Sequence, residues 1–181
     1  QMCIRDSTRT YTININRQAA SANNAGGNNN QNNNNQNNTD VNITSGKYSI
    51  GTYITGIEPG TGAADFVKNI AVSASGTVKL LTSSGSENSG KVATGNKVAV
   101  YDASGNLKKT YDIVVYGDIN GDGAVNALDM IKLNRHILGK GTLTGAYLEA
   151  ADANRKGDGG NALDMIIMNR HILGKSKISQ N

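Results

Sequence analysis

A short segment near the C-terminus carries oxygen-bearing side chains at regular intervals. Asp118, Asn120 and Asp122 alternate with other residues, Gly123 follows them, and Asp129 ends the series. Calcium prefers about six to eight hard oxygen ligands, and a loop that winds round the ion turns alternate side chains inward. Glycine permits the sharp turn that such a loop needs. The segment is therefore predicted to bind calcium.

The complete spacing matches that of an EF-hand calcium loop, with oxygen side chains at the first, third, fifth, ninth and twelfth positions and glycine at the sixth. A carbonyl supplies the seventh-position ligand in such loops. Magnesium is disfavoured because it resists a cage of this many protein oxygens. A turn rich in Asp and Asn, without metal, is the alternative. The predicted ligands of this first loop are Asp118, Asn120, Asp122, the Ala124 carbonyl, Asn126 and Asp129.

The segment that follows the first loop recurs once. Residues 126–140 reappear at 161–175 with thirteen of fifteen residues identical. A second loop precedes the second copy, but it is one residue longer, and Lys156 stands where the first loop has Asp122. Asp158 can take the missing ligand role if this loop bulges, so we expect weaker calcium binding or shifted ligands there. The predicted ligands of the second loop are Asp152, Asn154, Asp158, the Gly160 carbonyl and Asp164.

The two repeated segments are predicted to be helices with one buried side and one exposed side. At helical spacing, the apolar side of the first helix is formed by Met130, Ile131, Leu133, Ile137 and Leu138. On the other side, Leu128 lies near Lys132 and Arg135, and on the second helix Leu163 and Ile167 lie beside Arg170. Exposed apolar residues beside a basic one indicate a partner surface, although a solvated helix face is the alternative for the arginines.

No amphipathic helix precedes Asp118, because a β pattern ends at Tyr116 and Gly117. Each unit is thus a loop plus a helix, and two such units in tandem resemble a type I dockerin over residues 117–175. The resemblance implies a small all-α fold with two calcium-loop/helix F-hand motifs, a short connecting helix and two calcium ions. It also implies that the partner is a cohesin module of a scaffold protein in a cellulosome-type assembly.

In the dockerin family, the residues at the loop end and the basic residues on the exposed helix side choose the cohesin. The resemblance and the helical spacing together predict the partner-binding residues Ala127, Leu128, Lys132, Arg135, Ala162, Leu163, Ile167 and Arg170. The near-identity of the copies implies pseudo-two-fold symmetry, and the resemblance then implies two alternative binding poses, related by about half a turn. Asn134 and Asn169 stand where many relatives carry lysine, so the sequence does not identify the cohesin.

The preceding residues, 46–116, are expected to form a small α+β spacer module. Apolar residues recur at helical spacing from Ala63 to Ile70, and strand patterns cover 78–81, 97–101 and 110–116. The module resembles the small β-rich unit that often precedes the C-terminal module in large secreted proteins of Gram-positive anaerobes. Carbohydrate binding is the alternative to a spacer role.

The first part of the chain is expected to contribute no site. Residues 1–7 resemble a translated sequencing-adapter end, and residues 8–17 are predicted to be the terminal strand of a lost β-sandwich. Residues 18–45 form an Asn-rich linker, which has too few apolar groups to offset the entropy of ordering. Residues 176–181 are expected to be a tail. The parent protein is expected to extend upstream, where a signal peptide for a secreted or cell-surface protein would lie.

Composition excludes several classes of protein. The chain has 181 residues, a net charge of +4, one Cys and two His, and its basic residues form no block. We therefore expect no disulfide framework, zinc site or nucleic-acid interface. No apolar run is long enough to span a membrane. His136 and His171 occupy equivalent positions in the two helices and are expected to be surface or interface residues.

We expect a calcium-dependent protein–protein interaction module that docks a secreted polysaccharide-degrading or cell-surface protein onto a cohesin-bearing scaffold. The alternative is the C-terminal fragment of a glycoside hydrolase or other carbohydrate-active enzyme whose catalytic domain is missing. We assign no catalytic residue in this chain, because every Asp near a candidate cleft already belongs to a calcium loop. A free calcium sensor is disfavoured, since the entering helices of paired EF-hands are absent from the pattern.

Overall fold

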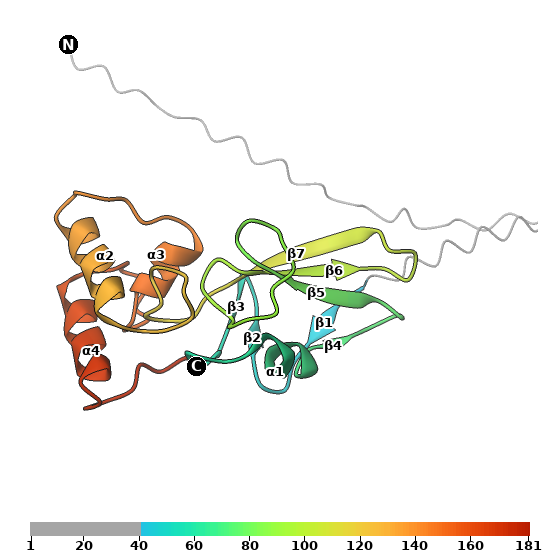
Figure 1. Cartoon of the computed structure of the whole chain (residues 1–181), viewed down its shortest axis with the longest axis horizontal. Coiled ribbons are helices and arrows are strands. Elements are labelled where there is room, and N and C mark those ends of the chain that lie inside the picture. The colour runs from blue at the N-terminus through green and yellow to red at the C-terminus, as the bar shows by residue number, and fades with distance from the viewer. Residues whose placement is uncertain (1–40) are drawn as a thin grey trace, which may run out of the picture. The chain divides into compact units, whose positions relative to one another are not determined.

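The computed structural model describes residues 41–181 (Figure 1). The predictions for residues 1–7 and 8–17, and for the linker up to residue 40, lie outside the described residues. None of the helices in the described part is long and apolar enough to cross a membrane.

A five-stranded sheet organises the first half of the described chain, which we call the sheet module (residues 41–113). The strands have the order β2-β3-β7-β6-β5, with β3 and β7 parallel and the other neighbours antiparallel. A separate pair, β1 and β4, is antiparallel. The strands are β1 (Ile43–Thr44), β2 (Ser49–Ile50), β3 (Tyr53–Thr55), β4 (Ala71–Val72), β5 (Thr77–Leu81), β6 (Lys97–Tyr101) and β7 (Leu107–Ile113).

One short helix, α1 (Ala63–Lys68), covers the core of this module. Its Phe66 is fully buried and lies beside Tyr48, with the two ring centroids 4.9 Å apart. In the sheet, Val98 pairs with Leu80 on one side and with Tyr111 on the other, so buried side chains meet across three strands. The expected combination of helix and strands is therefore present.

The predicted strand bounds agree with the structure for β6 but not for β7. Strand β6 spans the predicted residues, and the hairpin between β6 and β7 is formed. Strand β7, however, begins and ends three residues before the predicted range of 110–116. Residues 115 and 116 lie outside the ladder, because their backbone N–H groups donate to the side chains of Thr94 and Gln180. Buried β-branched residues at 114 and 115 mimic a strand pattern there.

The C-terminal half contains three helices, α2 (Ala127–Ile137), α3 (Ala146–Ala151) and α4 (Ala162–Ile172). The equivalent helices α2 and α4 lie side by side (Figure 1). Each begins with the same capping box, in which the Asn side chain accepts from backbone N–H groups of the helix and the Asp carboxylate accepts from the Asn backbone N–H. The short α3 occupies the place of the expected connecting helix.

The core between these helices is narrower than the apolar pattern predicts. Leu133 and Met168, at equivalent repeat positions, are fully buried. Ile131 and Leu138, in contrast, are 56% and 57% exposed, and Ile137 is 40% exposed. Their assignment to the core is wrong. Only a narrow side of α2 is covered by other parts of the chain, whereas the prediction assumed a broad buried apolar face.

No linker separates the sheet module from the following loop. The four residues 114–117 are all buried, and the first three alternate between two apolar clusters. Val115 belongs to the cluster of the sheet module, whereas Val114 and Tyr116 belong to the cluster beneath the helices. Tyr53 of β3 also packs against the second cluster. The two cores are thus joined through one continuous stretch of buried chain.

Two of the last six residues are buried in the segment that the sequence pattern indicates to be a tail. Ile178 and Gln180 are each 3% exposed. The Gln180 side-chain amide bonds both backbone groups of Tyr116: its oxygen accepts from the N–H at 2.8 Å, and its nitrogen donates to the carbonyl at 3.0 Å. The C-terminus therefore closes onto the chain at the point where the first loop begins.

Replacement of Gln180 tests this closure. In Gln180→Ala, both backbone groups of Tyr116 lose their partner while buried, so we expect the free energy of unfolding to fall by about 1–3 kcal/mol. Thermal or denaturant unfolding of the full chain measures the change. Ser176→Ala, at an exposed position of the same segment, is the control. Equal stability of the two variants would show that the contact contributes nothing.

Candidate functional site

The first loop is organised around the buried carboxylate of Asp118. One of its oxygens accepts from the N–H groups of Gly121 at 2.8 Å and Asp122 at 3.1 Å. The other accepts from Gly123 at 3.1 Å and from Thr94 of the sheet module at 2.9 Å. Backbone N–H groups thus wind the loop round the carboxylate, which is the arrangement that a glycine at the sixth position permits.

Asp129 closes the same loop from the first turn of α2. One carboxylate oxygen accepts from the N–H groups of Ile119 and Asn120, each at 2.8 Å, and the other accepts from Asn126 at 2.9 Å. Both ends of the loop are therefore fastened to one side chain. Asp118 and Asp129 are both fully buried, so two carboxylates lie in the interior of one loop.

Within residues 41–181, no basic side chain forms a salt bridge with these buried carboxylates. The salt bridge found within residues 41–181 joins Lys97 to Asp112, away from the loops. Burial raises the pKa of the Asp118 carboxyl to about 6, against the effect of its backbone N–H donors, and repulsion by Asp129 adds to the rise. Burial also raises the pKa of Asp129. The loop has negative charge that its own residues do not neutralise.

The remaining predicted ligands of the first loop lie nearer its surface. Asp122 is exposed, and Asn120 and Asn126 are half-buried. The Asn120 side chain donates to Asp122 at 2.8 Å. The side-chain oxygen of Asn126 accepts from the Leu128 N–H at 2.8 Å, so Asn126 caps α2 in this structure. Its ligand role, and that of the Ala124 carbonyl, stay predictions.

The second loop repeats this arrangement up to its sixth residue. Asp152 accepts from the N–H groups of Lys156 at 3.2 Å and Gly157 at 2.6 Å, as Asp118 does from the corresponding positions. Asp164 accepts from Asn154 and Asn161, both at 2.9 Å. Asp152 is 3% exposed and Asp164 fully buried, and burial raises the pKa of Asp164. Each loop therefore begins and ends on a buried Asp.

The additional residue of the second loop lies between its glycine turn and its helix cap. Three residues, 158–160, connect Gly157 to Asn161, where the first loop has two. The carboxylates of Asp152, Asp158 and Asp164 come together, with one oxygen of each within 4.8 Å of the others. An ion with Ca–O distances of about 2.4 Å spans such a separation. This is the bulged geometry in which Asp158 can replace the missing fifth-position acid.

The chemistry of both loops fits a hard divalent cation. All side-chain donors are carboxylate or amide oxygens, which calcium prefers to nitrogen or sulfur. In the second loop the side-chain nitrogen of Asn154 is buried without a hydrogen-bond partner, so this residue is incompletely satisfied beside the three carboxylates. Gly160, whose carbonyl is a predicted ligand, is held close to the helices. A Cβ atom at this position would lie 2.6 Å from Leu133 Cδ1 and 2.7 Å from Ala151 Cβ.

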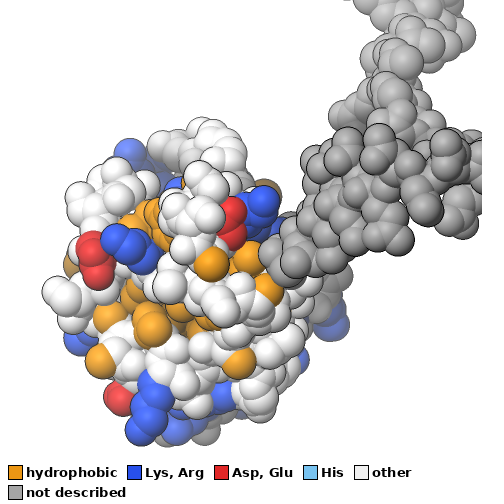
Figure 2. Space-filling view, turned by 90° about the vertical axis from the view of Figure 1, so that its right-hand side faces the viewer, with side chains coloured by type: hydrophobic (Ala, Val, Ile, Leu, Met, Phe, Trp, Pro, Cys, Tyr) orange, Lys and Arg blue, Asp and Glu red, His pale blue; other side chains and the backbone are white. Residues whose placement is uncertain are grey.

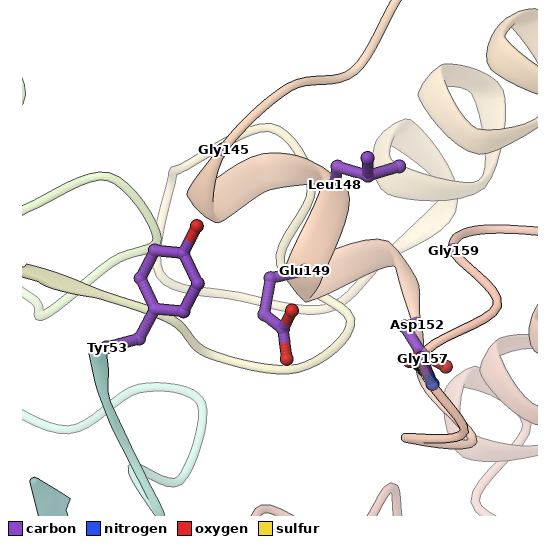
Figure 3. A pocket seen from close by; sticks show the side chains of 7 residues that line it. All are labelled: Tyr53, Gly145, Leu148, Glu149, Asp152, Gly157 and Gly159. Atoms are coloured by element: carbon purple, nitrogen blue, oxygen red, sulfur yellow. Dashed lines mark hydrogen bonds between the residues drawn. The ribbon is translucent and has the colours of Figure 1, made fainter. Parts of the chain in front are cut away.

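A small pocket borders the second loop (Figure 3). Tyr53 and Glu149 face its interior, and Asp152 lies beside Gly157 at its edge. Glu149 also accepts from the Tyr116 hydroxyl at 3.0 Å. Burial, followed by this hydrogen bond, raises the pKa of Tyr116 to about 12. The acids of this pocket are thus already part of the loop or of its support, and we assign the pocket no separate ligand.

Most of the predicted partner-binding residues are exposed. Leu128 and Leu163 are 58% and 55% exposed, and Ala127, Lys132, Arg135, Ala162 and Arg170 are exposed as well. Ile167 differs, because it is half-buried against the core beneath the helices, and its place on the exposed side is taken by Ile166. The expected exposure of Ile167 is therefore wrong, whereas its role in partner binding stays a prediction.

Two histidines have a structural role that the sequence pattern did not reveal. His136 Nδ1 accepts from the Leu143 N–H at 3.3 Å, and His171 Nδ1 accepts from the Ile178 N–H at 3.1 Å. Each histidine thus bonds the chain seven residues further on, after its helix has ended. Both are half-buried. They hold the segments that follow α2 and α4 against the ends of these helices. Helical periodicity in the sequence cannot reveal such a contact.

The comparison with protein families decides the class of this region. Residues 116–173 match the family model described as the dockerin type I domain. The resemblance to a type I dockerin is confirmed. No curated protein and no solved structure matches the chain. We refer to residues 116–173 as the dockerin segment. It contains both loops, all three C-terminal helices and all the predicted site residues.

The raised pKa of Asp118 predicts pH-dependent behaviour. The metal-free folded chain binds this proton more tightly than the unfolded chain, so the resulting stabilisation is present below about pH 4 and is lost as the pH rises through about 6. Because calcium must displace the proton, apparent affinity at the first loop is expected to be about tenfold lower near pH 5 than near pH 7.5. Calorimetric titrations at both pH values measure this. An unchanged affinity would contradict the assignment.

The backbone of Arg155 offers a second test. Arg155 has φ of +56°, in the left-handed region, at the position where the first loop has Gly121 with φ of +78°. We expect Arg155→Gly to stabilise the chain by about 1 kcal/mol relative to Arg155→Ala. Arg155→Ala is the matched control, because it removes the guanidinium near the Tyr116 ring but keeps the strain. Thermal unfolding of both variants gives the difference; a less stable glycine variant would be the contrary result.

Proposed function

We propose that the chain is a calcium-dependent docking module whose dockerin segment binds a cohesin. The observation that carries the proposal is the set of four buried loop carboxylates, Asp118, Asp129, Asp152 and Asp164, none of which forms a salt bridge within the described part of the chain. Buried charges of one sign destabilise a fold unless an opposite charge is supplied. A divalent cation in each loop supplies it.

The residues that would hold two calcium ions are those predicted from the spacing, with Asp158 in place of a fifth-position acid in the second loop. Bound calcium neutralises the carboxylates and fixes the loops. The N–H bonds to Asp118 and Asp152 orient their carboxylates, and the capping boxes fasten Asp129 and Asp164 to the starts of α2 and α4. Calcium binding is thereby coupled to the placement of both helices.

The cohesin surface is proposed on the exposed sides of α2 and α4. Both repeats carry the same exposed apolar residues, thirty-five positions apart and all 55–58% exposed. They are Leu128 and Ile131 on α2 with Leu138 at its C-cap, and Leu163 and Ile166 on α4 with Leu173 at its C-cap. On α2, Leu128, Ile131, Arg135 and Leu138 follow helical spacing, so they share one side. Repetition of this side on α4 supports two alternative binding poses. Exposed apolar groups beside arginine are typical of protein interfaces.

The sheet module is proposed to be a spacer, and no site on it supports a separate activity. On the face shown in Figure 2, Lys and Arg side chains lie at several separate places around apolar ones. We propose that any polysaccharide-degrading activity belongs to another part of a longer, secreted or cell-surface protein. The alternative, a fragment of a carbohydrate-active enzyme, concerns that parent protein and is compatible with a docking role for this chain.

Cohesin capture tests the proposal. We expect the wild-type chain to bind at least one member of a panel of immobilised cohesin modules in calcium, and to be released by a chelator. Leu128→Asp combined with Leu163→Asp is expected to weaken capture by about a hundredfold, because a charge replaces an apolar contact on both faces. Each single variant is expected to retain most of the binding, since the other face remains intact.

Leu107→Asp is the matched control for these substitutions. Leu107 is 57% exposed, like the two dockerin leucines, but it lies on β7 of the sheet module. Its replacement is expected to leave capture unchanged. Circular dichroism shows whether each variant is folded. Undiminished capture by the folded double variant, or no capture of the wild-type chain by any cohesin in the panel, would contradict the proposal.

A further inference from the structure

The two loops differ in what surrounds them. The sixth residues, Gly123 and Gly157, have the same left-handed backbone, with φ of +76° and +73°. A Cβ atom on Gly157 would meet nothing within 4 Å, whereas one on Gly123 would lie 2.8 Å from the Val92 carbonyl oxygen and 3.0 Å from Lys91 Cβ. The second loop is thus open at this point, and the first is covered by the sheet module.

The covering segment is the loop of residues 91–96, between β5 and β6, which we call the 91–96 loop. A Cβ atom on Gly121 would lie 2.9 Å from the Thr94 carbonyl oxygen, so the first loop touches this segment at two glycines. Gly60, also in the sheet module, donates its N–H to the Gly123 carbonyl at 2.8 Å. Backbone therefore meets backbone directly, which larger residues at either glycine would prevent.

Thr94 is the residue that connects the 91–96 loop to the predicted metal ligands. It is 1% exposed, and its N–H donates to the Asp118 carboxylate at 2.9 Å. Its hydroxyl donates to the Val115 carbonyl at 3.1 Å and accepts from the Val115 N–H at 3.0 Å. Thr94 thus holds both the first ligand and the chain that leads to it, three residues before Asp118.

The second loop has no corresponding donor. The hydrogen bonds found for the Asp152 carboxylate in the described chain come from Lys156 and Gly157, both within the loop itself. A contact that orients a ligand from outside the ligand set raises metal affinity, and its loss commonly costs about 10–100-fold. The asymmetry therefore affects one site and not the other.

We propose that Thr94 is a positioning residue for the first calcium site, so that the sheet module sets the affinity of that site and leaves the second site unaffected. The proposal rests on the proposed function, because it presumes that both loops bind calcium. It gives the sheet module a role beyond that of a spacer. The covered first loop is expected to fill at lower calcium concentration than the open second loop.

The test uses the full chain, titrated with calcium and followed by the backbone amide signals of residues 118–129 and 152–164 in NMR spectra. Thr94→Val keeps the shape of the side chain and the backbone N–H that donates to Asp118, but it removes the hydroxyl bonds to Val115 that hold this N–H in place. We expect affinity at the first loop to fall about tenfold with the second loop unchanged. Thr94→Ser restores the hydroxyl and is expected to restore the affinity. A merely stabilising residue would not lower the affinity of one loop alone. Thr110→Val, at an exposed position on β7, is the control.

A second pair of variants keeps the proposal testable if Thr94→Val does not fold. Gly123→Ala and Gly157→Ala impose the same left-handed strain, but only the first also presses on the 91–96 loop. We expect the loss of affinity at the first loop to exceed that at the second loop. Equal losses, or an unchanged first site in Thr94→Val, would overturn this inference alone. Absence of calcium binding by the wild-type chain would instead overturn the proposed function.

Discussion

Buried negative charge is the constraint on which the dockerin segment depends. Asp118 and Asp129 are fully buried in the first loop, and Asp164 is fully buried in the second, close to Asp152. Their carboxylates accept backbone N–H groups that wind each loop and start each helix, so they cannot be withdrawn to the surface without loss of the fold. Since the described chain provides no basic partner for them, these carboxylates require a bound cation. Metal binding is then coupled to folding and to the placement of helices α2 and α4.

The repeat is nearly exact in sequence but unequal in its surroundings. The helices α2 and α4 share their caps, their exposed apolar residues and the histidine contacts that follow them. The loops differ, since one is covered by the sheet module and the other has an additional residue and an arginine in left-handed backbone. Symmetry of the helices supports two binding poses, whereas asymmetry of the loops supports two calcium affinities. A duplicated unit can in this way keep one partner surface and still differ in its metal sites.

The sequence predicted those features that depend on local spacing. The positions of Asp118, Asp129, Asp152 and Asp164, the repeat and the exposed leucines could be read directly, because each follows from a loop or helix period. Contacts between distant segments could not. The Thr94 backbone N–H bonds Asp118 across 24 residues of sequence, and the Gln180 side chain bonds Tyr116 across 64. Neither hydrogen bond has a signature in the sequence. The apolar pattern also overestimated the core, because it cannot tell a residue that faces a second helix from one that faces a partner.

Calcium titration of the full chain tests the central claim most directly. Isothermal calorimetry with amide exchange in parallel would count the ions and locate the residues that they order. We expect two ions that bind at millimolar calcium or below, slower amide exchange throughout residues 118–137 and 152–172, and reversal by a chelator. An absence of binding heat together with unchanged exchange in both loops would contradict the central claim.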